Sequence, residues 1–234
     1  MENKKKYRHE LKYYITSDQI PIIKNRLLAI AKLDSHAGEN GIYTIRSLYF
    51  DSIANRCYYE NEDGVDKREK YRIRIYNGLS DRISLECKRK EHGMTQKKSC
   101  LIGKAQCLSL MRGQIPVDIE DNQRILKKLI FLMYTELFKP KVIVEYDRVP
   151  YIYSLGNVRI TIDANIRSSI EIDRFFETSL PTRPVLQSGQ HILEVKYDEF
   201  LPDYIKEVLE LGVFTQTAFS KYYICRRINT GGKL

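Results

Sequence analysis

The sequence contains no long apolar run. No segment approaches the ~20 consecutive apolar residues that a membrane-spanning helix needs, and the first ten residues, MENKKKYRHE, lack the apolar core of a secretory signal. We therefore expect a cytoplasmic protein without a transmembrane segment. If it acts at a membrane, we expect a membrane-bound partner protein to hold it there.

Closely spaced cysteine pairs are also missing. The five cysteines are an odd number, and no two of them stand in CxxC spacing. This pattern argues against a disulfide framework and against a zinc site, and it favours a reducing compartment. The four histidines show no spacing typical of a metal site or a catalytic triad.

No linker, internal repeat or low-complexity tract divides the chain. Its 234 residues, of which 43% are hydrophobic, predict a single domain over residues 1–234. The 39 Lys and Arg residues exceed the 30 Asp and Glu residues, which gives a formal net charge of +9. This charge favours an anionic partner such as nucleic acid, a membrane surface, a nucleotide or polyphosphate.

The chain alternates strand-like and helical patterns. Turn residues at Asn77-Gly78 and His92-Gly93 predict an antiparallel meander in the first half. The predicted strands are 7–15, 43–50, 68–76, 82–90, 97–101, 141–150, 158–163 and 191–198. Helices are predicted after the cap signal at 16–18 and over 104–112, 122–138, 201–211 and 217–228.

Charged side chains share one face of these strands. Residues two apart lie on the same face, so Arg72 and Arg74 lie opposite Tyr71, Ile73 and Ile75. A water-facing polar face would explain any one strand. Six strands with this habit predict instead a rolled sheet, with helices on its apolar outer face and charge inside. The inward sets are Arg8, Glu10 and Lys12; Lys70, Arg72 and Arg74; Ser84, Glu86, Lys88 and Lys90; Tyr146 and Arg148; Arg159, Thr161 and Asp163; and Glu194, Lys196 and Asp198.

Such an interior suits a polyanion. Clustered like charges repel and are costly to desolvate unless a partner neutralises them. Arginine binds phosphate through two parallel hydrogen bonds, and lysine binds it as a point charge. The acids Glu10, Glu86 and Glu194 would suit a hard divalent cation that also bridges phosphate oxygens.

The order of several segments resembles a known family. RHELKYYI, SLYFDS with its following YYE, KYRIRIYNG, LECKRK…KKS, VEYDRVPY, VRITID, ILEVKYDEFLP and SKYYICRR resemble, in order, the VTC-type polyphosphate polymerase domain of the triphosphate tunnel metalloenzyme (CYTH-like) superfamily. The resemblance covers nearly the whole chain. It implies an α+β fold, in which an antiparallel eight-stranded β-tunnel closes into a barrel with helices packed outside.

The same resemblance implies transfer of the γ-phosphate of ATP to a growing polyphosphate chain, assisted by Mn²⁺ or Mg²⁺. ATP and polyphosphate would be the ligands, and no nucleic acid is expected. Strand parity adds Lys196 and Glu10 to the residues that match the family. The expected site is then catalytic at Arg72, Arg74, Lys88 and Lys221; substrate-binding at Lys12, Lys98, Tyr146, Arg148, Arg159, Lys196 and Ser220; and metal-binding at Glu194 and Glu10.

One position departs from the wider group. Its hydrolytic members carry ExExK on the first strand, whereas this chain has Arg8, Glu10 and Lys12 there. Fewer carboxylates make a poorer site for two metals and for activating water, which favours transfer over hydrolysis. A tripolyphosphatase or nucleoside triphosphatase, a non-catalytic polyphosphate or nucleotide sensor, and an RNA-binding module remain the alternatives.

Overall fold

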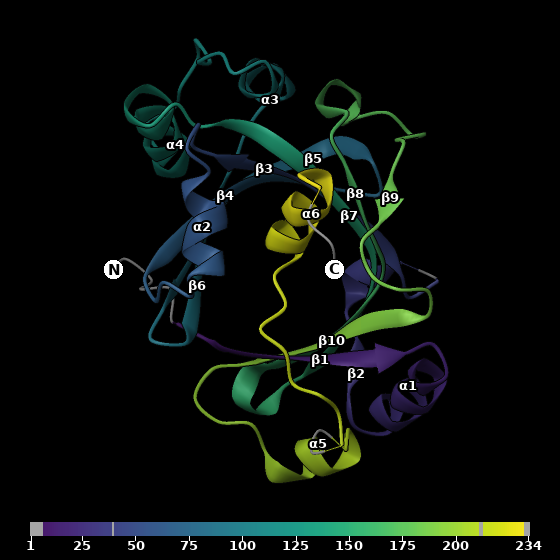
Figure 1. Ribbon diagram of the computed structural model, residues 1–234. Coiled ribbons are helices and arrows are strands. Elements are labelled where there is room, and N and C mark those ends of the chain that lie inside the picture. Colours follow the sequence, from purple (N-terminus) through teal and green to yellow (C-terminus); the bar gives the residue numbers. More distant parts are fainter. Residues whose placement is uncertain (1–6, 39, 211–212, 232–234) are drawn as a thin grey trace.

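The computed structural model describes residues 7–38, 40–210 and 213–231, and its centre is one curled antiparallel sheet (Figure 1). The strand order is β1-β10-β8-β7-β3-β4-β5-β6, with β2 and β9 attached at the side. The main strands are β1 (His9–Thr16), β3 (Tyr43–Asp51), β4 (Arg68–Tyr76), β5 (Leu79–Glu91), β6 (Met94–Leu101), β7 (Lys139–Tyr153), β8 (Val158–Ser169) and β10 (Gln190–Tyr197); β2 is Lys32–Leu33 and β9 is Arg183–Pro184. The α+β class and all eight predicted strands are therefore confirmed.

Helices cover the convex side of the sheet. α4 (Arg124–Thr135), within the helix predicted over 122–138, buries an apolar stripe that includes Leu126, Leu129 and Met133, and α3 (Lys104–Met111) packs beside it. α1 (Gln19–Ile30) and α5 (Asp203–Val208) join a second apolar cluster under β1, β8 and β10. The predicted end of the α5 helix at residue 211 lies outside the described residues. No helix in the described part of the chain could cross a bilayer on length and hydropathy.

Strand parity decides which face enters the core. On β4, Tyr71, Ile73 and Ile75 are fully buried in the apolar cluster. Arg72 and Arg74, between them, line an interior cavity. The rolled arrangement predicted from the alternation is thus the observed one, with side chains of period 2 separating core from cavity.

The prediction of a closed barrel is wrong, because the two edge strands of the sheet do not pair along their length. The edge strands β1 and β6 meet only where Arg8 and Thr95 exchange two backbone hydrogen bonds, of 2.8 and 2.9 Å. Beyond that point no ladder joins them among the described residues, so the sheet is an open half-barrel rather than a continuous cylinder. The hydrogen-bonding edge of β1 is used by another segment instead.

That segment, residues 213–220, runs from α5 past β1 to α6 (Lys221–Asn229) (Figure 1). The N–H of Thr217 donates to the carbonyl of Lys12, and the N–H of Tyr14 donates to the carbonyl of Thr215. Because Thr215, Gln216 and Thr217 pair with β1, α6 starts at Lys221, four residues later than the predicted Thr217. We call residues 213–220 the closing segment.

α6 then lies on the concave face at one end of the half-barrel. The centre of the Tyr222 ring lies 5.2 Å from that of Tyr49 on β3, with the two rings tilted by 36°, and Asn229 donates to Ser168 on β8. Ser220 caps the helix by accepting from the N–H of Tyr223. The sheet, the closing segment and α6 together enclose a polar interior.

Candidate phosphate-binding site

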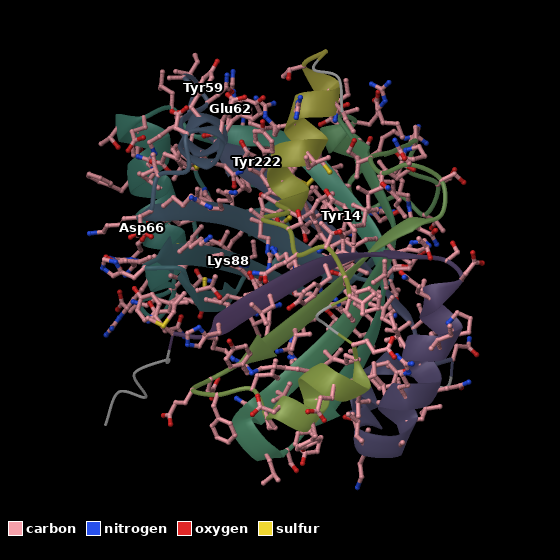
Figure 2. All side chains as sticks on the ribbon, turned by 60° about the horizontal axis from the view of Figure 1, so that its bottom comes forward. Tyr14, Tyr59, Glu62, Asp66, Lys88 and Tyr222 are labelled. Carbon is pink, nitrogen blue, oxygen red and sulfur yellow. The ribbon has the colours of Figure 1, made fainter. Side chains whose placement is uncertain are left out.

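The interior is a cavity of about 520 Å³. Its wall combines side chains from β1, β4, β5, β7 and β10 with the closing segment and the start of α6. The cations that line it are Lys12, Arg68, Lys70, Arg72, Arg74, Lys88, Lys90, Arg148, Lys196 and Lys221, and the carboxylates are Glu10 and Glu194. Figure 2 labels two residues of this lining, Lys88 near β1 and Tyr222 at α6.

Glu86 organises one side of the wall. It is 1% exposed and lies behind the lining rather than in it. Arg72 binds its Oε2 at 2.6 Å, Lys97 binds Oε1 at 2.8 Å, and Arg74 lies at 3.8 Å. Burial alone would raise the pKa of Glu86, but Arg74, Arg72 and Lys97 lower it well below its usual range. Glu86 therefore stays charged and fixes the two arginines in place.

A second cluster lies across the cavity on β1 and β10. Lys88 binds Glu10 at 2.6 Å, while Lys12 lies 3.6 Å from Glu10 and 3.7 Å from Glu194. Lys196 is paired with Glu194 and lies 3.4 Å from Glu10. Burial and the Glu194 charge would raise the pKa of Glu10, yet the surrounding lysines lower it far below the usual value.

Asp163 holds a third cluster at the α6 end. Arg148 binds both of its oxygens, at 2.6 and 2.8 Å, and Lys221 binds Oδ2 at 2.6 Å. Lys221 also lies 4.8 Å from the centre of the Tyr146 ring. Burial would raise the pKa of Tyr146, but Arg148, Arg74 and Lys221 lower it instead. The cationic field at this end is thus strong enough to favour an added negative charge.

A family model described as the VTC domain matches residues 7–228. The chain belongs to the VTC domain family. No curated protein matches the sequence. A protein of Bacillus halodurans provisionally assigned as an adenylate cyclase has a similar fold, with a TM-score of 0.53 and 13% identity over 92% of this chain and 94% of that one. A Hippeastrum protein provisionally assigned as an adenylyl cyclase, and described as having a dominant triphosphatase activity, gives a TM-score of 0.55 and 13% identity over 97% of both chains.

In this VTC domain most of the predicted site residues come together. Lys12, Arg72, Arg74, Lys88, Tyr146, Arg148, Lys196, Ser220 and Lys221 line the cavity, as do Glu10 and Glu194. Arg8, the residue that departs from ExExK, turns to the strand end and binds Asp198 at 2.8 Å. It therefore adds no charge to the cavity lining.

Two predicted residues lie elsewhere. Lys98 is opposite Cys87, an outward position, and is exposed, so the tunnel-side lysine of β6 is Lys97, opposite Lys88. The two-residue turn at His92-Gly93 pairs Glu91 with Met94 and so sets this register. Arg159 is 43% exposed and is paired with Asp34 at the far end of β8, away from the cavity.

The sequence prediction left out three residues of the site. The prediction named Lys98 in place of Lys97, although the register of the β5–β6 hairpin would have identified Lys97 as the inward residue. Tyr49 accepts a 2.8 Å hydrogen bond from Arg72, and its inward parity on β3 was the available signal. Lys70 lines the cavity; strand parity placed it on the inner face with Arg72 and Arg74, but it was not included among the predicted site residues.

The cavity could hold a divalent metal only if phosphate oxygens or water supplied most of its ligands. No group of three or more His, Cys, Asp or Glu residues in the described parts of the chain could hold an ion. Glu194 and Glu10 are the carboxylates that face the cavity, and both are already paired with lysines. A Mn²⁺ or Mg²⁺ ion would therefore take most of its ligands from phosphate oxygens and water, which is a common arrangement for Mg²⁺.

Proposed function

We propose that this VTC domain is a polyphosphate polymerase, which transfers the γ-phosphate of ATP to a growing polyphosphate chain in the cavity. One observation carries the proposal: cations from five strands and α6 converge on a single cavity, and buried carboxylates hold most of them in place. The arrangement matches the needs of phosphoryl transfer, which depends on positioning and on charge stabilisation rather than on covalent work by the protein.

Each cluster has a part in this chemistry. Arg72 and Arg74, fixed by Glu86, would hold the phosphates at the reacting centre, and Lys88 would add charge from the neighbouring strand. Lys221 and Ser220 would bind at the α6 end, where Tyr146 and Arg148 flank the donor triphosphate. Lys12 and Lys196 would hold the chain on the β1 and β10 side.

The metal would be held on Glu194, with Glu10 beside it. When bound, Mn²⁺ or Mg²⁺ supplies charge neutralisation between phosphate oxygens. The acceptor is a phosphate oxygen that is already ionised, so the proposal needs no general base. This agrees with a lining whose titratable groups are mainly lysines and arginines.

The competing candidate is a triphosphatase of the same fold. It is favoured by the adjacent positions of Glu10 and Glu194, two carboxylates that share Lys12 and Lys196 and could orient a water molecule. Arg8 argues against it, because it replaces the first carboxylate of the ExExK pattern with a cation that is bound to Asp198.

Incubation of the purified protein with ATP and Mn²⁺ separates the two. A polymerase forms ADP together with phosphate chains long enough to resolve by gel electrophoresis. One ADP is released for each phosphate added to a chain. Free orthophosphate as the sole phosphate product would establish the triphosphatase and reject the polymerase. Glu194→Gln is expected to lower either activity strongly, and Lys98→Met, on the outer face, is the matched control that should leave it unchanged.

A further inference from the structure

Lys70 differs from the other lysines deep in the cavity. Its ammonium donates to Asn61 Oδ1 at 2.5 Å and to Ser220 Oγ at 3.0 Å, and it lies 5.3 Å from the centre of the Tyr222 ring. None of these partners carries a formal negative charge. Among the described residues no carboxylate lies within ion-pair distance of Lys70, whereas Lys12, Lys88, Lys196 and Lys221 each have one.

The surroundings of Lys70 disfavour its charge. Burial lowers the pKa of Lys70 to about 7, and repulsion from Arg68, Lys88 and Lys12 adds to this shift. Cys57 and Glu60 on α2 (Arg56–Glu62) are the groups that oppose it, and the effect of Glu60 is small. A buried cation without a counter-charge costs free energy unless a ligand supplies the missing charge. The fold nevertheless keeps a lysine there, pointing into the cavity.

The position of Lys70 also fits an anion geometrically. Along β4, Arg68, Lys70, Arg72 and Arg74 follow one another on one face, about 6.6 Å apart by strand geometry. This row leads from the cavity mouth toward Tyr146. Lys70 stands where the row passes Ser220, the cap of α6, so that one phosphate could accept from both side chains.

We propose that Lys70, with Ser220, binds one phosphoryl group of the phosphate chain between the mouth of the cavity and Arg72. The inference rests on the proposed function and adds a binding position to it. Asn61 holds the ammonium in place when no anion is present. Removal of the Lys70 charge should weaken binding of a phosphate chain without disturbing Arg72 or Arg74, which Glu86 fixes independently.

Binding at this position should also take up a proton. At pH 8 most Lys70 side chains are neutral, and a bound phosphate restores the charged form. The uptake from Lys70 then approaches about one proton at pH 8, falls to about half a proton near pH 7 and is nearly lost by about pH 6, where the lysine is already protonated. Lys88, whose pKa is lowered to about 8 chiefly by burial, contributes to uptake in every variant, so the difference between variants isolates Lys70.

The test is calorimetric titration with inorganic tripolyphosphate, without metal, at pH 8 in buffers of different ionisation enthalpy. We expect Lys70→Met to bind about tenfold more weakly, the effect of one charge-assisted hydrogen bond, and to take up less proton. Lys70→Arg, charged at every pH, should keep the affinity and lose the Lys70 share of the uptake. Lys98→Met is the control for the loss of one surface lysine.

Thermal unfolding shows whether each variant is folded, and Lys70→Arg keeps the test open should Lys70→Met not fold. Equal affinity and equal proton uptake in the wild type and in both Lys70 variants would overturn the inference alone. Failure of the wild-type protein to bind tripolyphosphate would overturn the proposed function with it.

Discussion

Arg46 and Arg74 lie on neighbouring strands, side by side, but on opposite faces of the sheet. Register pairs Arg74 with Ser47 and Arg46 with Ile75, and the two arginines are 6% and 4% exposed. Arg46, on the outer face, is paired with Glu145 and donates to the carbonyls of Phe175 and Glu177 at 2.8 and 2.7 Å. Arg74, on the inner face, has 3.3 Å contacts to Ser47 and Tyr146 and lies 3.8 Å from Glu86.

The difference lies in how completely the partners use each guanidinium. Arg46 connects the loop that contains Phe175 and Glu177 to the sheet, and few of its N–H groups remain free to bind a ligand. The partners of Arg74 are longer and weaker, so its donors can turn to a ligand at low cost. Two equally buried arginines thus differ in role: Arg46 stabilises the fold and Arg74 is available to bind a ligand. Substitution of either residue tests this difference.

The largest effect is expected from Arg46→Met. The change leaves Glu145 buried beside Arg167 alone, so the free energy of unfolding should fall by about 3–5 kcal/mol. Urea unfolding at neutral pH measures it. Tripolyphosphate affinity of the folded fraction should stay within twofold of the wild type, and a large loss of affinity would contradict the division between the two faces.

Arg74→Met should show the reverse pattern. We expect the rate of phosphate-chain formation to fall by about 100-fold, the typical effect of one preorganised donor at a reacting centre. The midpoint of urea unfolding should change little, because Arg72 and Lys97 still neutralise Glu86. A variant that kept its activity would show that Arg74 is structural, like Arg46.

The smallest effect separates two adjacent lysines. Lys97→Met should weaken tripolyphosphate binding by about threefold, since its half-exposed ammonium is partly screened but neutralises Glu86 on the cavity side. Lys98→Met should bind as the wild type does. Equal losses in the two variants, measured by calorimetry at the same ionic strength, would mean that only net charge matters.

Much of the wall was predictable because alternation on a strand is local information. Tyr71 and Arg72 must take opposite faces whichever strand pairs with β4. The helix α2, which brings Asn61 to Lys70, could not be predicted in this way. Its residues carry no apolar stripe, and its N-terminus depends on Asp51, whose carboxylate accepts from the N–H groups of Cys57 and Tyr58.

Closure of the barrel was also beyond local information. The sequence of β1 shows a strand, but it does not show whether its outer edge pairs with β6 or with the closing segment. That choice depends on Thr215 and Thr217, about 200 residues away, and Thr217 was predicted to be the start of a helix. Both errors, the closed barrel and the start of the last helix at Thr217, therefore have one cause: the pairing of the closing segment with β1.

The closing segment has a consequence for how the site assembles. Thr217 follows every strand in the chain, and so do Ser220 and Lys221. A nascent chain in which β10 has just emerged can form the curled sheet, but the trough that contains Arg72 and Arg74 is then still open along the edge of β1. The ordering of chain synthesis therefore separates a stage with an open cationic groove, accessible to any polyanion, from a stage with an enclosed and more selective cavity.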